Sequence, residues 1–156
     1  MNYNELIGDT SVKFDDMPPG AFLLGLLSAF DNRYQACADS FFKEITWKQF
    51  FAIICIKVCG GNPTINQLSE VMGSSHQNVK QILIKLEKAG FVNLAPDEQD
   101  RRKQRIRLTE KCMEFCNSHE AESQKKLMQM FEGISNEEFY TAIRVIGKME
   151  SNIKQM

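Results

Sequence analysis

Hydrophobic residues recur at helical spacing along most of the chain, and strand-like alternation is confined to the stretch before residue 109. This pattern predicts a mainly α fold with a small β-hairpin (α+β). Helices are expected over residues 21–43, 46–59, 64–72, 75–89 and 109–131, with a last helix after Ser135. Residues 1–19 show little periodicity and end in Pro18-Pro19, so we expect an extended arm there.

The helices over residues 64–72 and 75–89 are joined by a very short turn. Thr64 and Gln67 form a capping box at the start of the first helix, and Gly73 ends it. Ser74-Ser-His-Gln77 is interpreted as a second capping box, so the next helix begins almost at once. Two helices joined so tightly, with glycine at the joint, are typical of a helix-turn-helix.

The second of these helices has a polar outer face opposite an apolar stripe. Asparagine and glutamine can pair with adenine in the DNA major groove, and lysine suits phosphate oxygens. A polar face that is merely solvated is the alternative, but the preceding helix and the following hairpin favour DNA. The predicted contacts are Ser74, Ser75, His76, Gln77, Asn78, Lys80, Gln81 and Lys85.

A hairpin is expected next, with strands over residues 91–94 and 104–108. Its tip carries a cluster of cations that can enter a narrow minor groove or hold phosphates, which is typical of a wing. Acidic residues Asp97, Glu98 and Asp100 are expected to brace the arginines rather than touch DNA. The predicted wing contacts are Arg101, Arg102, Lys103 and Arg105.

The residues that follow the second helix resemble the MarR family of bacterial transcriptional regulators. The resemblance rests on Gly90-Phe-Val, Pro96-Asp97, Asp100-Arg101-Arg102 and Leu108-Thr109-Glu110-Lys111. It implies a winged helix-turn-helix over residues 46–109. It further implies that residues 1–43 and 110–156 supply dimerisation helices, within one domain spanning 1–156.

The same resemblance implies a function: a homodimeric repressor that binds a pseudo-palindromic operator in double-stranded DNA and is released by a small-molecule effector. The effector pocket would lie where the dimerisation helices meet the winged region. Its candidate lining residues are Arg33, Trp47, Phe50 and Phe51. Aromatic residues at helical spacing also suit a plain hydrophobic core, which is the alternative for this cluster.

The charge distribution changes the picture given by the whole-chain net charge of −1. Residues 76–111 carry nine Lys and Arg against five Asp and Glu, a local net charge of +4. The segments on either side are both net negative. Because the local field attracts a phosphate backbone, this partition favours nucleic-acid binding.

Two alternatives to a ligand-controlled DNA-binding repressor also fit the sequence. The departures from the family pattern at Leu94 and Gln99 remove expected cations, which motivates a winged-helix module that binds protein and does not read DNA. Some MarR-like proteins resemble peroxide sensors, and Cys112, beside Lys111 near a helix start, is the redox candidate. We therefore keep a thiol-based sensor as an alternative.

No enzyme, cofactor or metal is predicted. The chain has two histidines and no glycine-rich phosphate loop or nucleophile elbow. Cys112, Cys116 and His119 share a helical face, but three ligands on one helix seldom complete a tetrahedron around zinc. Five cysteines without a C-x-x-C pair, no secretory signal and no bilayer-spanning apolar run indicate a cytoplasmic protein without a membrane partner.

Overall fold

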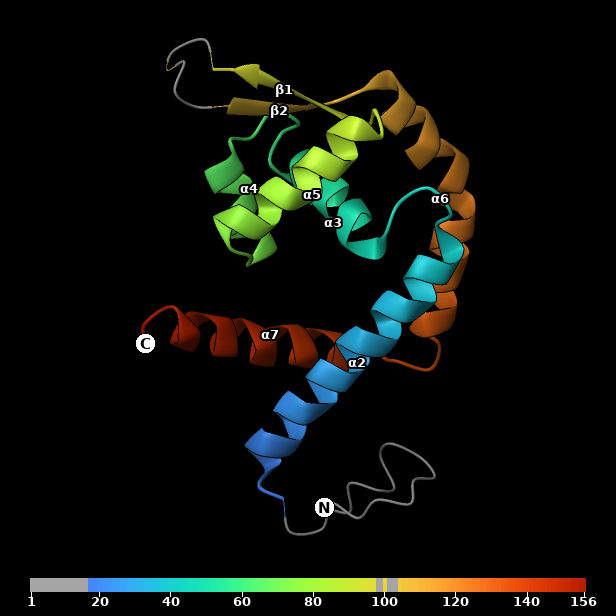
Figure 1. The fold of residues 1–156 in the computed structure, drawn as a ribbon. Helices are drawn as coiled ribbons and strands as arrows, with labels where there is room; N and C mark the ends of the chain where they lie inside the picture. Colours follow the sequence, from blue (N-terminus) through green and yellow to red (C-terminus); the bar gives the residue numbers. More distant parts are fainter. Residues whose placement is uncertain (1–16, 98–99, 101–103) are drawn as a thin grey trace. The chain divides into compact units, whose positions relative to one another are not determined.

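The computed structural model describes residues 17–97, 100 and 104–156, and the chain divides into two compact units after Cys112. The first unit contains α2 (Pro19–Phe41), α3 (Trp47–Val58), α4 (Ile65–Met72), α5 (His76–Lys88), β1 (Val92–Pro96) and β2 (Gln104–Leu108) (Figure 1). Helix α6 (Glu110–Met130) begins there and continues into the second unit, which also holds α7 (Asn136–Ile153). The expected mainly helical fold with one small hairpin is confirmed.

The first unit is a winged helix-turn-helix. Helices α3, α4 and α5 contact one another, and the antiparallel hairpin lies against them (Figure 1). The core is made of side chains that are at most 1% exposed and come from all three helices and both strands: Ile53, Ile56, Leu68, Val79, Leu83, Leu86, Phe91, Val92 and Ile106. Burial of this kind is the main stabilising contribution to a small domain.

Local capping interactions set where the helices begin. The Thr64 side chain accepts a hydrogen bond from the backbone N–H of Gln67, whose side chain accepts one from the N–H of Thr64, as expected. Gly73 ends α4 in the left-handed conformation, with φ +59°. Only glycine adopts that conformation without strain.

The second capping box is not formed, and the N-cap of α5 lies one residue later than expected. The Ser74 N–H still donates to Ser69 O, at 3.1 Å, which closes the end of α4. Ser75 is therefore the N-cap of α5, and its hydroxyl accepts from the N–H of Asn78 at 3.2 Å. The interpretation of Ser74 and Gln77 as the box was wrong because Ser74 still belongs to the preceding turn.

Strand β1 also differs from the expected range. Gly90 has φ +79°, and the Phe91 N–H donates to Leu86 O at 2.9 Å, so Phe91 completes the end of α5. Pairing begins with Val92 opposite Leu108 and ends with Pro96 opposite Gln104. The first strand is thus shifted toward the wing relative to the expected residues 91–94.

The second unit holds most of α6 and all of α7. Ser135 caps α7 through a capping box with Glu138, as its sequence suggests. The hydrogen bonds from the Ser135 hydroxyl and backbone N–H lower the pKa of Glu138. No residue of α7 is buried. Across the described parts of both units, no helix combines the length and the hydropathy needed to cross a membrane.

Candidate nucleic-acid interface

The outward face of α5 is polar and exposed because the opposite face is anchored in the core. Val79, Ile82, Leu83 and Leu86 are buried at the i, i+3, i+4, i+7 positions. The side chains predicted to contact DNA are exposed on the other side: His76, Gln77, Asn78, Lys80, Gln81 and Lys85. The structure therefore groups the helical members of the predicted set on one accessible face.

Ser74 and Ser75 orient the first turn of this face. The Asn78 amide donates to the Ser74 hydroxyl at 2.8 Å, while the Asn78 backbone N–H donates to Ser75. An amide side chain has two N–H donors and one carbonyl acceptor. Asn78 can thus keep its bond to Ser74 and still offer one donor and one acceptor, the pattern that pairs with adenine N7 and N6.

The wing is described only at its base, since the predicted contacts Arg101, Arg102 and Lys103 lie outside the described residues. Arg105 is described, and its guanidinium has two partners within the protein. Its Nε donates to the Asp97 carboxylate, and one terminal nitrogen donates to Asn62 O at 3.1 Å. Asp97 is 5% exposed and also accepts from the Asp100 N–H at 2.8 Å.

Arg105 therefore joins the hairpin to the segment before α4. The Ile106 N–H donates to Pro63 O at 3.0 Å, and Thr64 forms an isolated bridge with Arg105. Of the acidic residues that were expected to brace the arginines, Asp97 forms an ion pair with Arg105. The expected contact of Arg105 with DNA is untested, but in this arrangement its guanidinium positions the wing.

Replacing Arg105 with leucine is expected to lower the free energy of unfolding by about 2–3 kcal/mol. The substitution removes the Arg105 cation from the buried Asp97 carboxylate, and the partial exposure of Arg105 keeps the cost below that of a fully buried pair. Urea denaturation measures it. Adding Asp97→Asn to Arg105→Leu should recover part of the loss, whereas additive losses would contradict a direct pairing.

Arg107 was not among the predicted contacts although it lies two residues beyond Arg105 on the same strand. It is exposed and faces Asn93 in the strand register. Ile106, between the two arginines, is fully buried. Strand alternation alone therefore places Arg107 on the outer surface of the hairpin, where a cation can reach phosphate.

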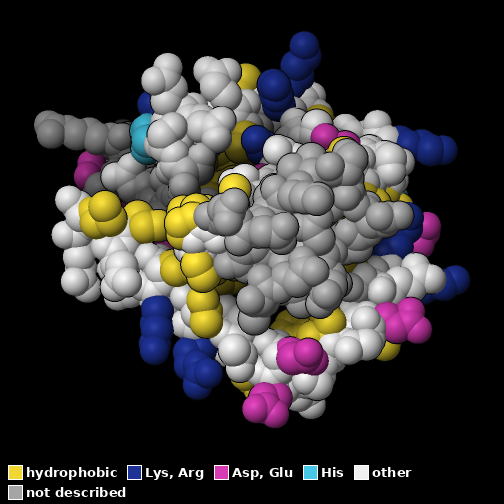
Figure 2. All heavy atoms as spheres, turned by 90° about the horizontal axis from the view of Figure 1, so that it is seen from below, with side chains coloured by type: hydrophobic (Ala, Val, Ile, Leu, Met, Phe, Trp, Pro, Cys, Tyr) yellow, Lys and Arg dark blue, Asp and Glu magenta, His cyan; other side chains and the backbone are white. Residues whose placement is uncertain are grey.

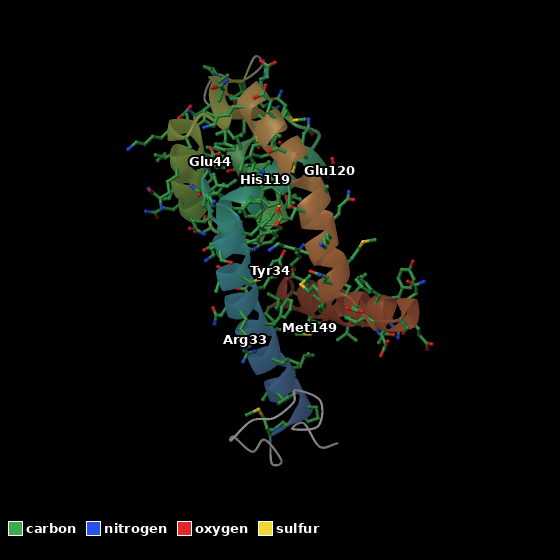
Figure 3. The ribbon with its side chains drawn as sticks, turned by 90° about the vertical axis from the view of Figure 1, so that its right-hand side faces the viewer. Arg33, Tyr34, Glu44, His119, Glu120 and Met149 are labelled. Carbon is green, nitrogen blue, oxygen red and sulfur yellow. The ribbon has the colours of Figure 1, made fainter. Side chains whose placement is uncertain are left out.

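The candidate effector-pocket residues fall into two groups. Trp47, Phe50 and Phe51 form a ring cluster on α3, with centroids 6.0–6.1 Å from Trp47 to the two phenylalanines. The ring of Tyr34, on α2, contacts Trp47 edge-on, with the ring centroids 4.6 Å apart. Burial raises the pKa of the Tyr34 hydroxyl, and the nearby Cys37 raises it further by a smaller amount. Arg33 is exposed on α2 beside Tyr34 (Figure 3).

The two buried cysteines, Cys55 and Cys112, do not have the accessibility of a reactive thiol. Cys112, the redox candidate, is 0% exposed, whereas a reactive thiolate must be reached by its oxidant. This burial argues against Cys112 as a redox-active thiol, a role suggested by its position near the start of a helix. Burial, with a smaller contribution from Cys59, raises the pKa of Cys55. Among the described side chains, no three His, Cys, Asp or Glu residues are arranged to hold a metal ion.

Comparison with known proteins finds a family model that matches the winged region and solved structures that share the fold. The model of the MarR family matches residues 45–103. A MarR protein from Peptoclostridium difficile superimposes with a TM-score of 0.77 at 19% identity, covering 94% of this chain and 96% of its own. A mutant MarR from E. coli, solved with operator DNA, has a TM-score of 0.73 at 21% identity and coverages of 89% and 99%.

BpsR from Bordetella bronchiseptica, whose DNA binding is regulated by 6-hydroxynicotinic acid, has a TM-score of 0.72 at 16% identity. It covers 90% of this chain and 98% of its own. At these identities the structural likeness establishes the fold, while the family model identifies the winged region. The resemblance inferred from the sequence is thus confirmed: the MarR family model matches residues 45–103, and the chain shares its fold with solved MarR-family regulators.

Proposed function

We propose that the protein is a DNA-binding transcriptional regulator that works as a homodimer. The observation that carries this proposal is the exposed, amide- and lysine-rich face of α5, which lies opposite a buried apolar stripe and beside a hairpin. In a winged helix-turn-helix the second helix enters the major groove. The local net charge of +4 over residues 76–111 supports attraction to phosphate.

The N-terminal half of α5 would read bases, and the wing would contact the flanking minor groove. The base-reading candidates are His76, Gln77, Asn78 and Gln81, with Lys80 and Lys85 on phosphates. The E. coli relative solved with operator DNA supports DNA binding by this fold. A two-fold dimer would recognise a pseudo-palindrome with half-sites about 10 base pairs apart, or a small multiple of that distance.

Helix α7 supports the dimer. Its hydrophobic stripe is exposed, including Ile143 at 58%, Ile146 at 43% and Ile153 at 62%. Figure 2 shows several hydrophobic side chains at the surface on the face of the molecule seen from below. An amphipathic helix gains stability when such a stripe is covered, and a second copy of the same helix provides a matching surface.

Repression relieved by a small molecule is the regulatory mode we propose. The regulation of BpsR by 6-hydroxynicotinic acid supports it, and the ring cluster of Tyr34, Trp47, Phe50 and Phe51 offers flat apolar surfaces for such a ligand. The effector must bind the released state more tightly than the DNA-bound state, since only differential affinity shifts a population.

Selection of bound duplexes from a random DNA pool tests the proposal, with salt titrations on the best and worst binders. A palindromic winner whose affinity falls steeply as salt rises is the expected result. Weak binding without sequence preference would overturn it. That outcome would favour a winged module that binds protein.

Replacing Gln77 with alanine is expected to weaken binding to the selected duplex by about 1–3 kcal/mol, because a base-pairing amide would be lost. Fluorescence anisotropy on the selected and on a scrambled duplex measures the change. Asn117→Ala removes an exposed amide from α6 and serves as the matched control. An equal loss on both duplexes would show that Gln77 contacts phosphate instead of a base.

A further inference from the structure

The C-terminal end of α5 is held by two residues that follow the hairpin. Three consecutive backbone carbonyls accept hydrogen bonds there. Lys111 Nζ donates to Ala89 O at 2.9 Å, the Thr109 hydroxyl donates to Gly90 O at 2.7 Å, and the Thr109 N–H donates to Phe91 O at 3.1 Å. Helix ends leave such carbonyls without intrahelical partners, so these bonds fasten the end of α5 to the start of α6.

The Lys111 ammonium also contacts Glu44 and the Phe91 ring, and both residues belong to the first unit. The ammonium lies 3.6 Å from Glu44 Oε2, in the connection between α2 and α3, and 4.7 Å from the centroid of the Phe91 ring. The Cδ atom of Lys111 lies 3.7 Å from the position that a Cβ atom would occupy if residue 90 were not glycine. One ammonium, with three donor hydrogens, thus links the end of α5 to the α2–α3 connection.

The chemistry of the site suits a cation. The C-terminus of a helix carries partial negative charge, the face of an aromatic ring attracts an ammonium, and Glu44 is an anion. The ion pair is about half exposed on both sides, so it contributes little stability by itself. The contact set is therefore better suited to fixing an orientation than to holding the domain together.

We propose that Lys111 is a positioning residue that sets the orientation of α5 for DNA and couples it to the α2–α3 connection through Glu44. This inference rests on the proposed DNA-binding function. Helix α5 spans about 20 Å, so a small tilt about its C-terminal end displaces the base-reading side chains of its first turn. Movement of the α2–α3 connection would reach the reading face by this route.

Replacing Lys111 with methionine, in the full-length protein, removes the charge and the donors while keeping an unbranched apolar stem. The expected result is a loss of affinity on the order of tenfold for the selected duplex, with an unchanged slope of log affinity against log salt. Lys111→Arg, which keeps a cation and donors, should restore part of the affinity. Lys43→Met, a charge loss next to Glu44, is the matched control and should bind as the unmodified protein does.

Coupling through Glu44 is tested by a double-mutant cycle on operator affinity. Glu44→Gln alone should weaken binding, and in the Lys111→Met background it should add little. Hydrogen exchange in the absence of DNA gives a second readout. Amides in the last turn of α5 should exchange faster in Lys111→Met than in Lys43→Met.

The outcomes separate this inference from the proposed function. Absence of sequence-specific binding by the unmodified protein would overturn the proposed function and this inference with it. Normal binding by the unmodified protein and by Lys111→Met would overturn the inference alone. A salt slope smaller by about one unit would show that Lys111 contacts phosphate. Lower stability with unchanged affinity and specificity would reduce its role to a structural one.

Discussion

Replacing Ile143 and Ile146 together with glutamate is expected to convert the proposed dimer to a monomer. Both side chains lie on the exposed stripe of α7, and neither is needed to cover a core within its own unit. Two carboxylates on each copy would be buried against each other without cations, which costs far more than the apolar contact contributes. Sedimentation equilibrium measures the change directly.

The same double variant should lose operator affinity by roughly 10²- to 10⁴-fold, because each winged region would then bind its half-site independently. Thr141→Glu with Asn152→Glu adds the same charge on the opposite face of α7 and is the matched control. Its mass and affinity should remain those of the unmodified protein. A dimer that survives the stripe substitutions would place the interface elsewhere.

Replacing Phe91 with alanine is expected to lower the free energy of unfolding by about 3–5 kcal/mol, the largest effect of any single substitution proposed. The side chain is fully buried, so its removal leaves a cavity in the core of the first unit. Its ring also faces the Lys111 ammonium, and that contact would be lost as well. Urea denaturation at a fixed protein concentration measures the change, since stability of a dimer depends on concentration.

Phe91→Leu is the graded control for this cavity. It keeps most of the apolar volume, and we expect a loss of about 1–1.5 kcal/mol. Similar small losses for leucine and alanine would mean that the surrounding core collapses into the space. The ring would then be less important to packing than its burial indicates.

Interactions between residues close in sequence were predicted well. Thr64 with Gln67 and Ser135 with Glu138 form the expected capping boxes because their partners are three residues apart. The N-cap of α5 is Ser75 and not Ser74 because Ser74 closes the preceding helix, which its residue type does not reveal. The start of β1 moved for a similar reason, since Phe91 completes the end of α5.

Interactions between distant residues could not be predicted in this way. Arg105 was grouped with the wing cations by composition, but one of its partners, Asn62 O, lies 43 residues earlier in the chain. Lys111 was noticed in the sequence as part of the family motif and as a neighbour of Cys112, but its contacts with Ala89 and Glu44 depend on how the hairpin returns the chain to the end of α5. The burial of Cys112 likewise depends on packing.

The sequence by itself determined the helix-turn-helix, the hairpin and the polar face of α5, because periodicity, capping and turn residues act within a few positions of the chain. Only the tertiary structure decided which cations remain exposed for a ligand and which position the helix and the wing. A guanidinium or ammonium has the same charge in either role. Its function depends on whether packing brings a carboxylate or a carbonyl from a distant segment within hydrogen-bonding distance.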